Sequence, residues 1–479
     1  MKKRTKILAT VGPASDSLEQ LEALIRAGVN VFRMNFSHGT HAYHADVLKR
    51  IRQAMENTGL IVGVLQDISG PKVRVGKLEE DFLLEKGDRL EFVKEEVVGR
   101  KLGEGRYRLC INQSGILAKL KTGEFIYLYD GTIRAQVESV GEKVVALVQN
   151  TGKLSSNKGV NFPNTRIGID ILTLKDRKDM LWGIENGVDF MAISFVQNAG
   201  DMANARRIVL ENGGTQQLFA KIEKFDAVEN IDAILKVSDG IMVARGDLGI
   251  EVPYYEVPAI QKRVIQKANE ASKPVITATQ MLLSMTEHET ATRAEISDVA
   301  NAVLDGTDVV MLSEESAVGH NPVLVVETMV NTIRETEKIY PYDKFNRFAM
   351  QDEMDMIDES AVLLASKLKA NALLAFTTSG QSAKKLARYR PEKTILAIMH
   401  DERVARSLTI VWGVAPAFLV KRDKLERMLS DVVKSGLENG VLEREGCYIL
   451  TAGDPVGVPG TTNNIRILRS PEMDYFNDL

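Results

Sequence analysis

Two short motifs place one cation and two carboxylates at the ends of apolar segments. Lys221 and Glu223 follow the run Leu218–Ala220, and Asp247 follows the run Ile241–Val243. Continuous apolar runs predict buried parallel strands, so each motif is expected where a strand emerges at its carboxyl end. One ammonium group and two carboxylates are the smallest set that holds a divalent metal against a phosphoryl group. The two motifs therefore favour phosphoryl transfer.

Each of these charged groups also has a purely structural explanation when it is considered alone. Glu223 and Asp247 could be solvated acids at strand ends, and Lys221 could form an ordinary salt bridge to Glu223. Acids at two strand ends, one of them two residues from a lysine, are nevertheless unusual. Charged groups gathered at one edge of a fold are typical of a functional site.

The elements that must position these groups follow from the periodicity of the chain. Its 479 residues suggest roughly three domains, and the 44% hydrophobic content is that of a globular protein. Apolar runs of strand length alternate with amphipathic stretches at Lys6–Val11, Val29–Phe36, Leu60–Gln66, Val188–Phe195, Leu218–Glu223, Gly240–Ala244, Pro274–Gln280 and Asp308–Leu312. Alternating strand and helix units in this number close a parallel barrel, whose carboxyl face carries the chemistry.

The connection between the third and fourth runs is much longer than the others. Short β-branched segments such as Phe125–Tyr129 and Lys143–Val148 are separated there by glycine-rich turns. We interpret residues 70–168 as an inserted β domain that hangs over the carboxyl face as a lid and excludes water. The predicted barrel then comprises residues 1–69 and 169–340.

A third domain, of α/β type, is predicted for residues 341–479. Its expected strands are Ala372–Ser379, Ile395–His400, Ala417–Val420, Tyr448–Ala452 and Ile465–Leu468. The turn Thr377–Ser382 precedes a predicted helix at Ala383–Tyr389, so hydroxyl and backbone N–H groups gather at a helix N-terminus. This turn could cradle a phosphate group, although helix capping would explain it about as well. The later loop Gly457–Asn463 is expected to close the same pocket.

Charge and cysteine content argue against several classes of function. Lys+Arg 61 against Asp+Glu 65 gives a formal charge of -4, which offers no general attraction for nucleic acid. No stretch predicts a membrane span, and Gly12–Asp16 interrupts the first apolar run too early for a signal peptide. Cys110 and Cys447 lack metal-ligand spacing and are expected to be reduced thiols. We therefore predict a cytoplasmic protein that binds neither nucleic acid nor membrane.

Seven motifs, taken in chain order, resemble those of the pyruvate kinase family across all three predicted domains. They are Thr5–Ser15, Arg33–Gly39, Asp67–Arg74, Lys221–Glu223, Ala244–Glu251, Thr277–Met285 and Thr292–Asp305. Such a series in the right order is far more specific than any single short pattern. The resemblance implies an α/β fold, a (β/α)8 TIM barrel with an inserted β-barrel lid domain and a C-terminal Rossmann-like domain. It also implies transfer of a phosphoryl group from phosphoenolpyruvate to ADP, giving pyruvate and ATP in the final step of glycolysis.

The resemblance assigns the phosphoryl site to four charged residues. Glu223 and Asp247 match the ligands of Mg²⁺ (or Mn²⁺), a hard cation that completes its coordination with water and phosphate oxygens. Lys221 matches the lysine that contacts the transferred phosphoryl group. Arg33 is expected to grip the same group, because a guanidinium binds phosphate oxygens in a fixed fork.

The substrate carboxylate and the proton transfer involve neighbouring residues of the same resemblance. Backbone N–H groups of Gly246 and Asp247 are expected to bind the carboxylate, together with Thr279. Thr279 and Ser313 match positions from which a water relay could deliver a proton to the enolate of pyruvate. Either hydroxyl could equally be bonded to its own backbone.

Four residues match nucleotide-binding positions of the family: Asn35, His38, Arg74 and Lys158. Arg74 and Lys158 reach the phosphates of ADP from the lid. His38, His41 and His44 are spaced by three residues, which is compatible with a metal site. Carboxylates already provide the magnesium site, so a histidine metal site is not favoured.

The requirement for a monovalent cation is where this chain departs from the best-known members. Those members hold K⁺ at positions matched here by Asn35, Ser37, Asp67 and the carbonyl of Ile68. They have a glutamate where this chain has Lys72. An ammonium group at the edge of the site can supply the charge that K⁺ would otherwise bring, and in the family this lysine accompanies K⁺-independent activity. We hypothesise that K⁺ is not required.

The resemblance further implies regulation and assembly. The residues Thr377, Thr378, Ser379, Gly380 and Ser382 resemble the family's effector phosphate loop, which implies a phosphorylated small-molecule activator and a homotetramer. Two other functions stay open. A magnesium-dependent barrel lyase or aldolase acting on pyruvate or phosphoenolpyruvate would use similar ligands but no ADP. A catalytically inactive metabolite sensor would be expected to have lost Lys221, Arg33 or a metal ligand, and all are present.

Overall fold

A closed barrel of parallel strands forms the centre of the molecule. The computed structural model describes residues 3–163, 165–344, 348–349, 352–421, 423–453 and 462–479. Eight strands close in the order β1-β2-β3-β13-β14-β15-β16-β17, and β17 pairs again with β1. They are β1 Lys6–Thr10, β2 Val31–Asn35, β3 Gly63–Asp67, β13 Phe190–Ile193, β14 Gln217–Ile222, β15 Gly240–Ala244, β16 Val275–Ala278 and β17 Val309–Leu312. The predicted barrel is confirmed, with every predicted run contributing one strand.

Both faces of the barrel strands are buried, as expected for a parallel sheet that is covered by helices. In β1, Ile7 and Ala9 pack outward against the helices, whereas Leu8 faces the interior with Val31 and Met242. Side chains therefore fill the barrel, and the space for ligands lies beyond the carboxyl ends of the strands.

Helices surround the barrel and connect its strands. They are α1 Leu18–Ala27, α2 His41–Thr58, α3 Leu174–Glu185, α4 Ala199–Glu211, α5 Phe225–Glu229, α6 Ile231–Val237, α7 Arg245–Glu251, α8 Val257–Glu270, α9 Arg293–Asp305, α10 Glu314–Ala317 and α11 Pro322–Glu337. Ser17 caps α1 by accepting a hydrogen bond from the N–H of Gln20, and Gly28, with φ of 126°, ends it. Local capping thus sets where the chain turns back to the next strand.

The segment between β3 and β13 forms a separate β-sheet lid. Its strands are β4 Phe82–Leu84, β5 Arg89–Val93, β6 Arg100–Gly103, β7 Arg106–Cys110, β8 Phe125–Leu128, β9 Ile133–Val140, β10 Val144–Val148, β11 Gly152–Leu154 and β12 Val160–Asn161. The main sheet has the order β12-β8-β9-β10-β5-β7-β6, and β11 pairs with β4 in a second sheet. The segment Arg74–Leu78 forms single bridges to Gly159, next to β12, and to Gly99, next to β6, so it contacts both edges of the main sheet.

The C-terminal domain is a five-stranded sheet with helices around it. Its strands are β18 Ala372–Phe376, β19 Thr394–Met399, β20 Val414–Leu419, β21 Tyr448–Gly453 and β22 Thr462–Leu468, in the order β20-β19-β18-β21-β22 with only β22 antiparallel. Its helices are α12 Glu353–Lys367, α13 Gln381–Arg388, α14 Glu402–Ser407, α15 Leu425–Glu438 and α16 Ser470–Asp478. The predicted α/β character of this region is confirmed.

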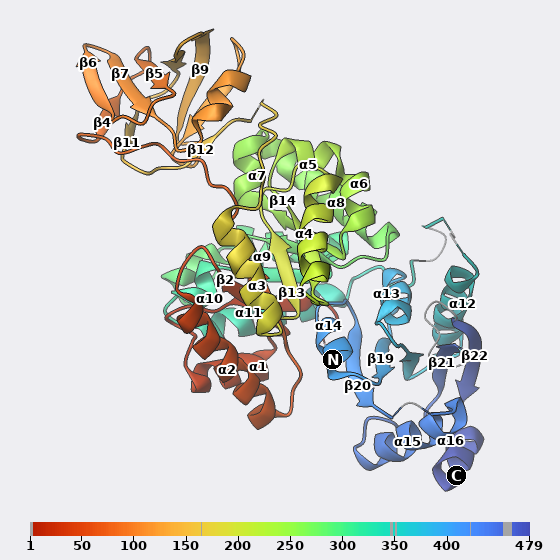
Figure 1. Cartoon of the computed structure of the whole chain (residues 1–479). Helices are drawn as coiled ribbons and strands as arrows, with labels where there is room; N and C mark the ends of the chain where they lie inside the picture. The colour runs from red at the N-terminus through yellow and green to blue at the C-terminus, as the bar shows by residue number, and fades with distance from the viewer. Residues whose placement is uncertain (1–2, 164, 345–347, 350–351, 422, 454–461) are drawn as a thin grey trace.

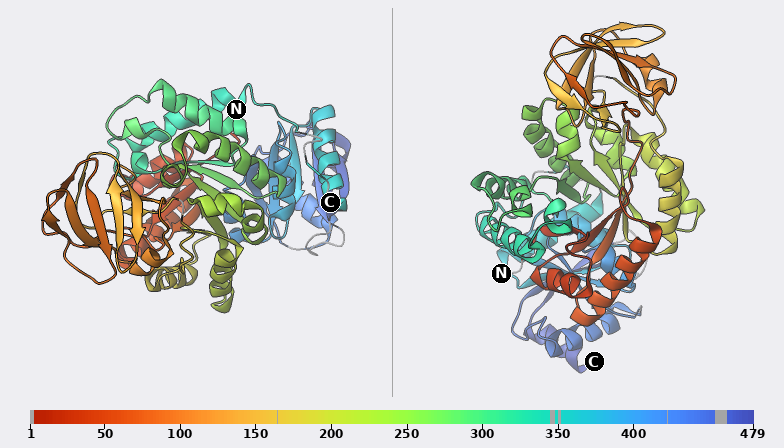
Figure 2. Two further views of the ribbon diagram at one scale, coloured as in Figure 1. Left: turned by 90° about the horizontal axis from the view of Figure 1, so that it is seen from above. Right: turned by 90° about the vertical axis from the view of Figure 1, so that its left-hand side faces the viewer.

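The lid and the C-terminal domain lie at opposite ends of the molecule, with the barrel between them (Figure 1). The view in the right panel of Figure 2 shows the same arrangement along another direction. The lid is next to α7, which follows a barrel strand at its carboxyl end. In the part of the chain that the structure describes, no helix has the length and apolar character needed to cross a membrane.

Candidate active site

The carboxyl ends of β2, β3 and β14 bring four charged side chains together. The Asp67 carboxylate lies between two cations, with Arg33 Nε 2.7 Å from its Oδ2 and Lys221 Nζ 3.2 Å from its Oδ1. Lys221 Nζ also lies 2.8 Å from Glu223 Oε1 and donates a hydrogen bond to Ser194 Oγ at 2.9 Å. The structure thus assembles Arg33, Lys221 and Glu223 as predicted, and adds Asp67 to the same cluster.

In this buried cluster, the pKa of each charged group is set by burial and by the charges of its neighbours. Burial acts against the charged form of Asp67, but the charges of Lys221 and Arg33 outweigh it and lower the pKa of that carboxyl group. Burial likewise disfavours charged Lys221, yet Asp67, Glu223 and Asp247 together raise its pKa above the usual range. Lys221 is therefore a fixed cation at neutral pH, as stabilisation of a phosphoryl group requires.

Glu223 and Asp247 fit the role of ligands to a divalent metal. Glu223 is 2% exposed and accepts a hydrogen bond from the Phe195 N–H at 2.9 Å. Burial raises the pKa of Glu223, and the nearby carboxylate of Asp247 raises it further against the opposing charge of Lys221. The two neighbouring carboxylates are hard oxygen donors that share the single cation Lys221, and Mg²⁺ would supply further positive charge between them. Among the described residues, no group of three or more His, Cys, Asp or Glu side chains could hold a metal, so water and substrate oxygens would complete its shell.

Thr279 and Gly246 meet at the start of α7. The Gly246 N–H donates to Thr279 Oγ1 at 2.9 Å, and that hydroxyl donates to the Ala278 carbonyl at 2.7 Å. Thr279 has φ of 68°, an uncommon backbone conformation for a β-branched residue. Two of the groups predicted to bind the substrate carboxylate are therefore adjacent and bonded to each other, in a turn whose backbone is strained.

Arg245 is a positioning residue that the sequence interpretation missed. Its guanidinium donates to the carbonyls of Ala278 and Thr279, at 3.1 and 2.6 Å, and lies 2.7 Å from Asp298 of α9. It therefore fixes the strained turn that carries Thr279. Its place beside Gly246, in the same motif, was the signal available in the sequence.

Ser313 is held in a similar way by Glu315, a fully buried carboxylate. Glu315 accepts hydrogen bonds from the N–H groups of Ser313, at 2.7 Å, and Leu282, at 3.1 Å. Ser313 follows β17, and Thr279 follows the neighbouring strand β16. The two candidate hydroxyls thus extend from adjacent strands.

A cleft of about 250 Å³ lies between the lid and the barrel, and three cationic side chains line its lid side. Lys72, Arg74 and Lys158 line it together with Asp247 of α7. The Arg74 guanidinium donates to the Asn157 carbonyl at 2.8 Å, and Lys158 Nζ lies 4.1 Å from the centre of the Tyr129 ring. A cleft with cations on one wall and a metal-ligand candidate on the other is suited to a polyphosphate.

A direct contact links the lid to α7 in this cleft. Asn161 of β12 donates to Glu251 Oε1 at 3.0 Å, while Lys224 Nζ lies 2.8 Å from Glu251 Oε2. Glu251 and Asp247 are one turn apart on α7. The position of the lid is thus coupled to the helix that carries a predicted metal ligand.

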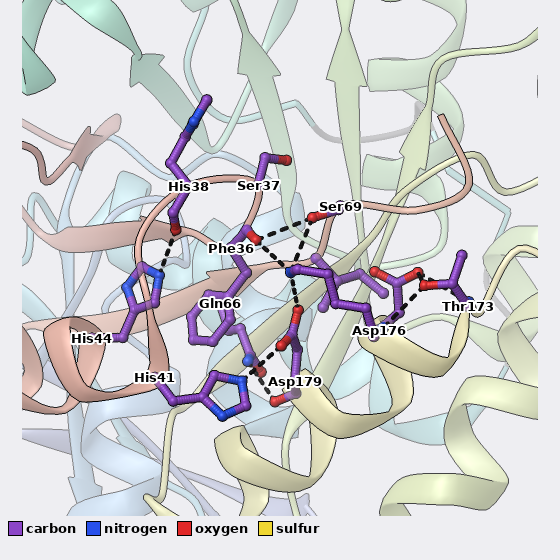
Figure 3. A network of polar contacts seen from close by, with 12 residues as sticks. Phe36, Ser37, His38, His41, His44, Gln66, Ser69, Thr173, Asp176 and Asp179 are labelled. Carbon is purple, nitrogen blue, oxygen red and sulfur yellow. Dashed lines mark hydrogen bonds and ion pairs between the residues drawn. The ribbon is translucent and has the colours of Figure 1, made fainter. Parts of the chain in front are cut away.

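The loops after β2 and β3 are held by the first turns of α3 (Figure 3). Lys175 donates to the Phe36 carbonyl at 2.7 Å and contacts Asp179 at 2.6 Å. The Gly70 N–H, at the root of the lid, donates to Asp176 Oδ1 at 3.0 Å. One helix therefore fixes both the loop that follows Asn35 and the base of the lid.

The three spaced histidines have separate surroundings. His41 lies 2.7 Å from Asp179, and His44 stacks on Phe36 with ring centres 4.0 Å apart. The His38 side chain is exposed and points away from the other two in Figure 3. Its carbonyl lies 2.9 Å from His44 Nε2. Arg74 and Lys158 line the same cleft, whereas His38 and Asn35 are not among the residues that line it.

The four positions matched to a K⁺ pocket lie at the carboxyl ends of β2 and β3, where Asn35 and Asp67 end the strands, and in the loops that follow. The side-chain oxygen of Asn35 accepts from the Ser37 N–H at 3.1 Å, and the Ile68 carbonyl accepts from Ser194 Oγ at 2.7 Å. Asp67 is bound by Arg33 and Lys221, as described above. Protein donors thus already engage three of the four candidate ligands.

The predicted effector loop lies between β18 and α13. The Gly380 N–H donates to Thr377 Oγ1 at 2.9 Å, and Gly380 adopts φ of 88° at the cap of α13. Ser382 Oγ lies 2.8 Å from Thr462 Oγ1, and Thr378 and Ser379 are exposed. Residues 457–461 of the predicted closing loop lie outside the described residues.

Comparisons with known proteins agree with this geometry. The family model described as pyruvate kinase, barrel domain, matches residues 2–326, and the model described as pyruvate kinase, alpha/beta domain, matches residues 355–468. The chain is 42% identical to a pyruvate kinase of Agrobacterium vitis, with 98% of each chain covered. It is 39% identical to one of Clostridium acetobutylicum, covering 97% of this chain and 99% of the relative. A crystal structure of a pyruvate kinase from Cryptosporidium parvum has 34% identity and a TM-score of 0.91, covering 98% of this chain and 96% of that one.

Proposed function

This chain belongs to the pyruvate kinase family, and from this premise we propose that it carries out Mg²⁺-dependent phosphoryl transfer from phosphoenolpyruvate to ADP. The products are pyruvate and ATP, and release of enolpyruvate to its keto form drives the reaction in the glycolytic direction. The observation that carries the proposal is the buried cluster of Lys221, Arg33, Asp67 and Glu223 beside Asp247.

The residues of the cluster have distinct roles in this proposal. Mg²⁺ held by Glu223 and Asp247 would stabilise negative charge on the phosphoryl oxygens. Lys221, kept protonated by the surrounding carboxylates, offsets the charge that moves onto those oxygens during transfer. Arg33 binds the same group through the donors that Asp67 leaves free, and Asp67 orients the guanidinium.

The substrate carboxylate is placed at the start of α7. There the Gly246 N–H and the Thr279 hydroxyl are adjacent, and substrate would exchange their mutual hydrogen bond for bonds to the carboxylate. Thr279 and Ser313, from adjacent strands, support delivery of a proton to the enolate through water.

The lid favours this reaction over a lyase or aldolase. Lys72, Arg74 and Lys158 line the cleft beside Asp247, where a lyase of pyruvate or phosphoenolpyruvate would need no cations for a second phosphate substrate. A metabolite sensor is not favoured, because the cluster is complete.

The test is formation of ATP and pyruvate from phosphoenolpyruvate, ADP and Mg²⁺, with Lys221→Ala as the matched variant. Loss of at least 100-fold in kcat is expected in the variant, because one preorganised donor commonly contributes about 10²–10³-fold. Inactive wild-type enzyme would exclude the proposal.

We further propose that K⁺ is not required. Lys72 lines the cleft, and Asp67 already has two cationic partners. The rate should persist when K⁺ is replaced by tetramethylammonium at constant ionic strength, and Lys72→Glu should introduce K⁺ dependence. Loss of nearly all wild-type activity without K⁺ would refute this part alone.

Regulation by a phosphorylated small molecule and a homotetrameric assembly complete the proposal. The exposed Thr378 and Ser379, before the cap of α13, support a phosphate-binding role for this loop. Substrate saturation curves with sugar phosphates and nucleotides, together with light scattering, test both statements. A set of unchanged curves would remove the regulatory claim, and a monomeric mass would remove the tetramer.

A further inference from the structure

A small cavity lies between the amino-terminal ends of the barrel strands and α13 of the C-terminal domain, far from the site described above. Lys273 and Asp308, which precede β16 and β17, line it from the barrel. Lys384 and Arg388 of α13 line it from the other side, followed by Arg390. Figure 1 shows α13 on the side of the C-terminal sheet that faces the barrel. Four cations therefore meet a single carboxylate in the wall of this cavity.

One of the four cations, Arg390, is paired with the carboxylate of the cavity wall. Arg390 lies 3.0 Å from Asp308 and also donates to the Gly306 carbonyl at 2.7 Å. The charges of this pair cancel, although Arg390 Nε has no hydrogen-bond acceptor among the described residues. Asp308 thus has little capacity left for the other cations.

The two lysines lack a carboxylate partner. Lys384 is 8% exposed, and its ammonium group donates only to the Gln217 side chain, at 3.1 Å, among the described residues. Lys273 donates to the carbonyls of Leu235 and Ser238. Within the described chain, neither ammonium group has a carboxylate oxygen within 4.0 Å. Lys384 is buried and Lys273 is half-buried, and an ammonium group removed from water without a counter-charge is costly unless another anion accompanies it.

Arg388 has unused donors in the same wall. It is 3% exposed, and its Nε and Nη2 have no hydrogen-bond acceptor among the described residues. Its Nη1 lies 3.5 Å from Asp355, which also contacts Lys385, and 3.5 Å from Ser272 Oγ. Buried arginine donors are normally satisfied, so an acceptor is missing here.

Asp239, which does not line the cavity, acts on the two lysines from a distance. Asp239 favours the charged forms of Lys273 and Lys384 but is itself paired with Arg206. Burial lowers the pKa of both lysines, and the opposing effect of Asp239, joined by Asp308 for Lys384, offsets this only in part. The wall thus retains an excess of positive charge and of hydrogen-bond donors.

The size of the cavity limits what can satisfy these groups. The cavity has a volume of about 10 Å³, which leaves room for one particle of roughly the size of a water molecule. Water would bring no charge and could accept only two of the free donors. We propose that this cavity binds a chloride ion, which helps to hold the C-terminal domain on the barrel.

Bromide provides a direct test, because it replaces chloride and scatters anomalously. Crystals of the wild-type chain grown in bromide should show an anomalous peak within the cavity, in contact with Lys384 and Arg388. A cavity without such a peak, or one that holds only water, would overturn the proposal. This measurement needs no variant and is independent of folding defects.

Thermal unfolding in solution tests the energetic role. Chloride is compared with gluconate at constant ionic strength, and the expected rise in Tm is roughly 1–3 °C per tenfold increase in chloride above its dissociation constant. Lys384→Met should abolish this dependence. The matched control Lys385→Met, adjacent on α13 but paired with Asp352 and Asp355, should retain it. Equal chloride dependence in wild type and Lys384→Met would refute the site, as would none in the wild type.

Discussion

The contact between the lid and α7 predicts a defined cost for opening the nucleotide cleft. Asn161→Ala removes the hydrogen bond from β12 to Glu251. Hydrogen bonds to charged groups contribute about 1.5–3 kcal/mol, and the half-buried position of Asn161 places this one near the lower limit. Glu251 keeps its partner Lys224, so no buried charge is left unpaired and nothing larger is added. About 1.5 kcal/mol corresponds to a roughly tenfold shift of the lid away from the barrel.

Steady-state kinetics resolve this prediction. Because Arg74 and Lys158 are on the lid wall of the cleft, the KM for ADP should rise roughly tenfold, while the KM for phosphoenolpyruvate changes less. The control Asn150→Ala removes hydrogen bonds to the Arg134 N–H and the Thr132 carbonyl, both within the lid. It should lower lid stability without changing the KM for ADP. An Asn161→Ala enzyme whose KM for ADP stays within twofold of wild type would refute the coupling.

Two further predictions concern single residues. Arg245→Lys keeps the charge but cannot hold the Ala278 and Thr279 carbonyls and Asp298 together. The value of kcat/KM for phosphoenolpyruvate should therefore fall about tenfold or more, while the circular dichroism spectrum is unchanged. The exposed Arg207→Lys is the control, and wild-type kinetics in Arg245→Lys would contradict the positioning role. Glu91 in the lid has its pKa lowered to about 2 by hydrogen bonds from Lys143 first, and then from Arg106 and Arg108, against the effect of burial. The folded pKa is below the unfolded value of 4.5, so the stabilisation is present above pH 4.5 and disappears as the pH falls toward 2. Glu91→Gln should therefore lower the Tm by roughly 5 °C at pH 6, with a difference that narrows below pH 4.5. A pH-independent difference would contradict this assignment.

The barrel could be predicted from sequence because its strands are short apolar runs bounded by polar and glycine residues. The prediction Gly240–Ala244 agrees with β15 at both ends. The prediction Leu60–Gln66 begins three residues before β3, because Leu60 and Ile61 are apolar but 49% and 41% exposed in the turn after α2. Apolar composition alone cannot distinguish such an exposed turn from the first residues of a buried strand.

The sequence indicated the residues of the candidate site and the possible pairing of Lys221 with Glu223, but not the pairing of Asp67. Asp67 was assigned to a monovalent-cation pocket, whereas the structure places it between Arg33 and Lys221. These residues are on β2, β3 and β14, and they meet only when the barrel closes, so no spacing rule along the chain relates them. Arg245 was missed for a related reason, because its partners are on the following strand and on α9.

The insertion of the lid has a consequence for how the barrel assembles. Leu65 of β3 pairs with Phe190 of β13, although about 125 positions separate them. For a flexible chain, closing such a loop instead of one about five times shorter would cost only about 1.4 kcal/mol of extra entropy. The lid forms its own sheet, and its root at Gly70 is bonded to Asp176 of α3, to which the chain returns. Because the two ends of the folded lid lie close together, the lid constrains the barrel no more than a short loop would. This explains why an insertion of this size leaves strand closure intact.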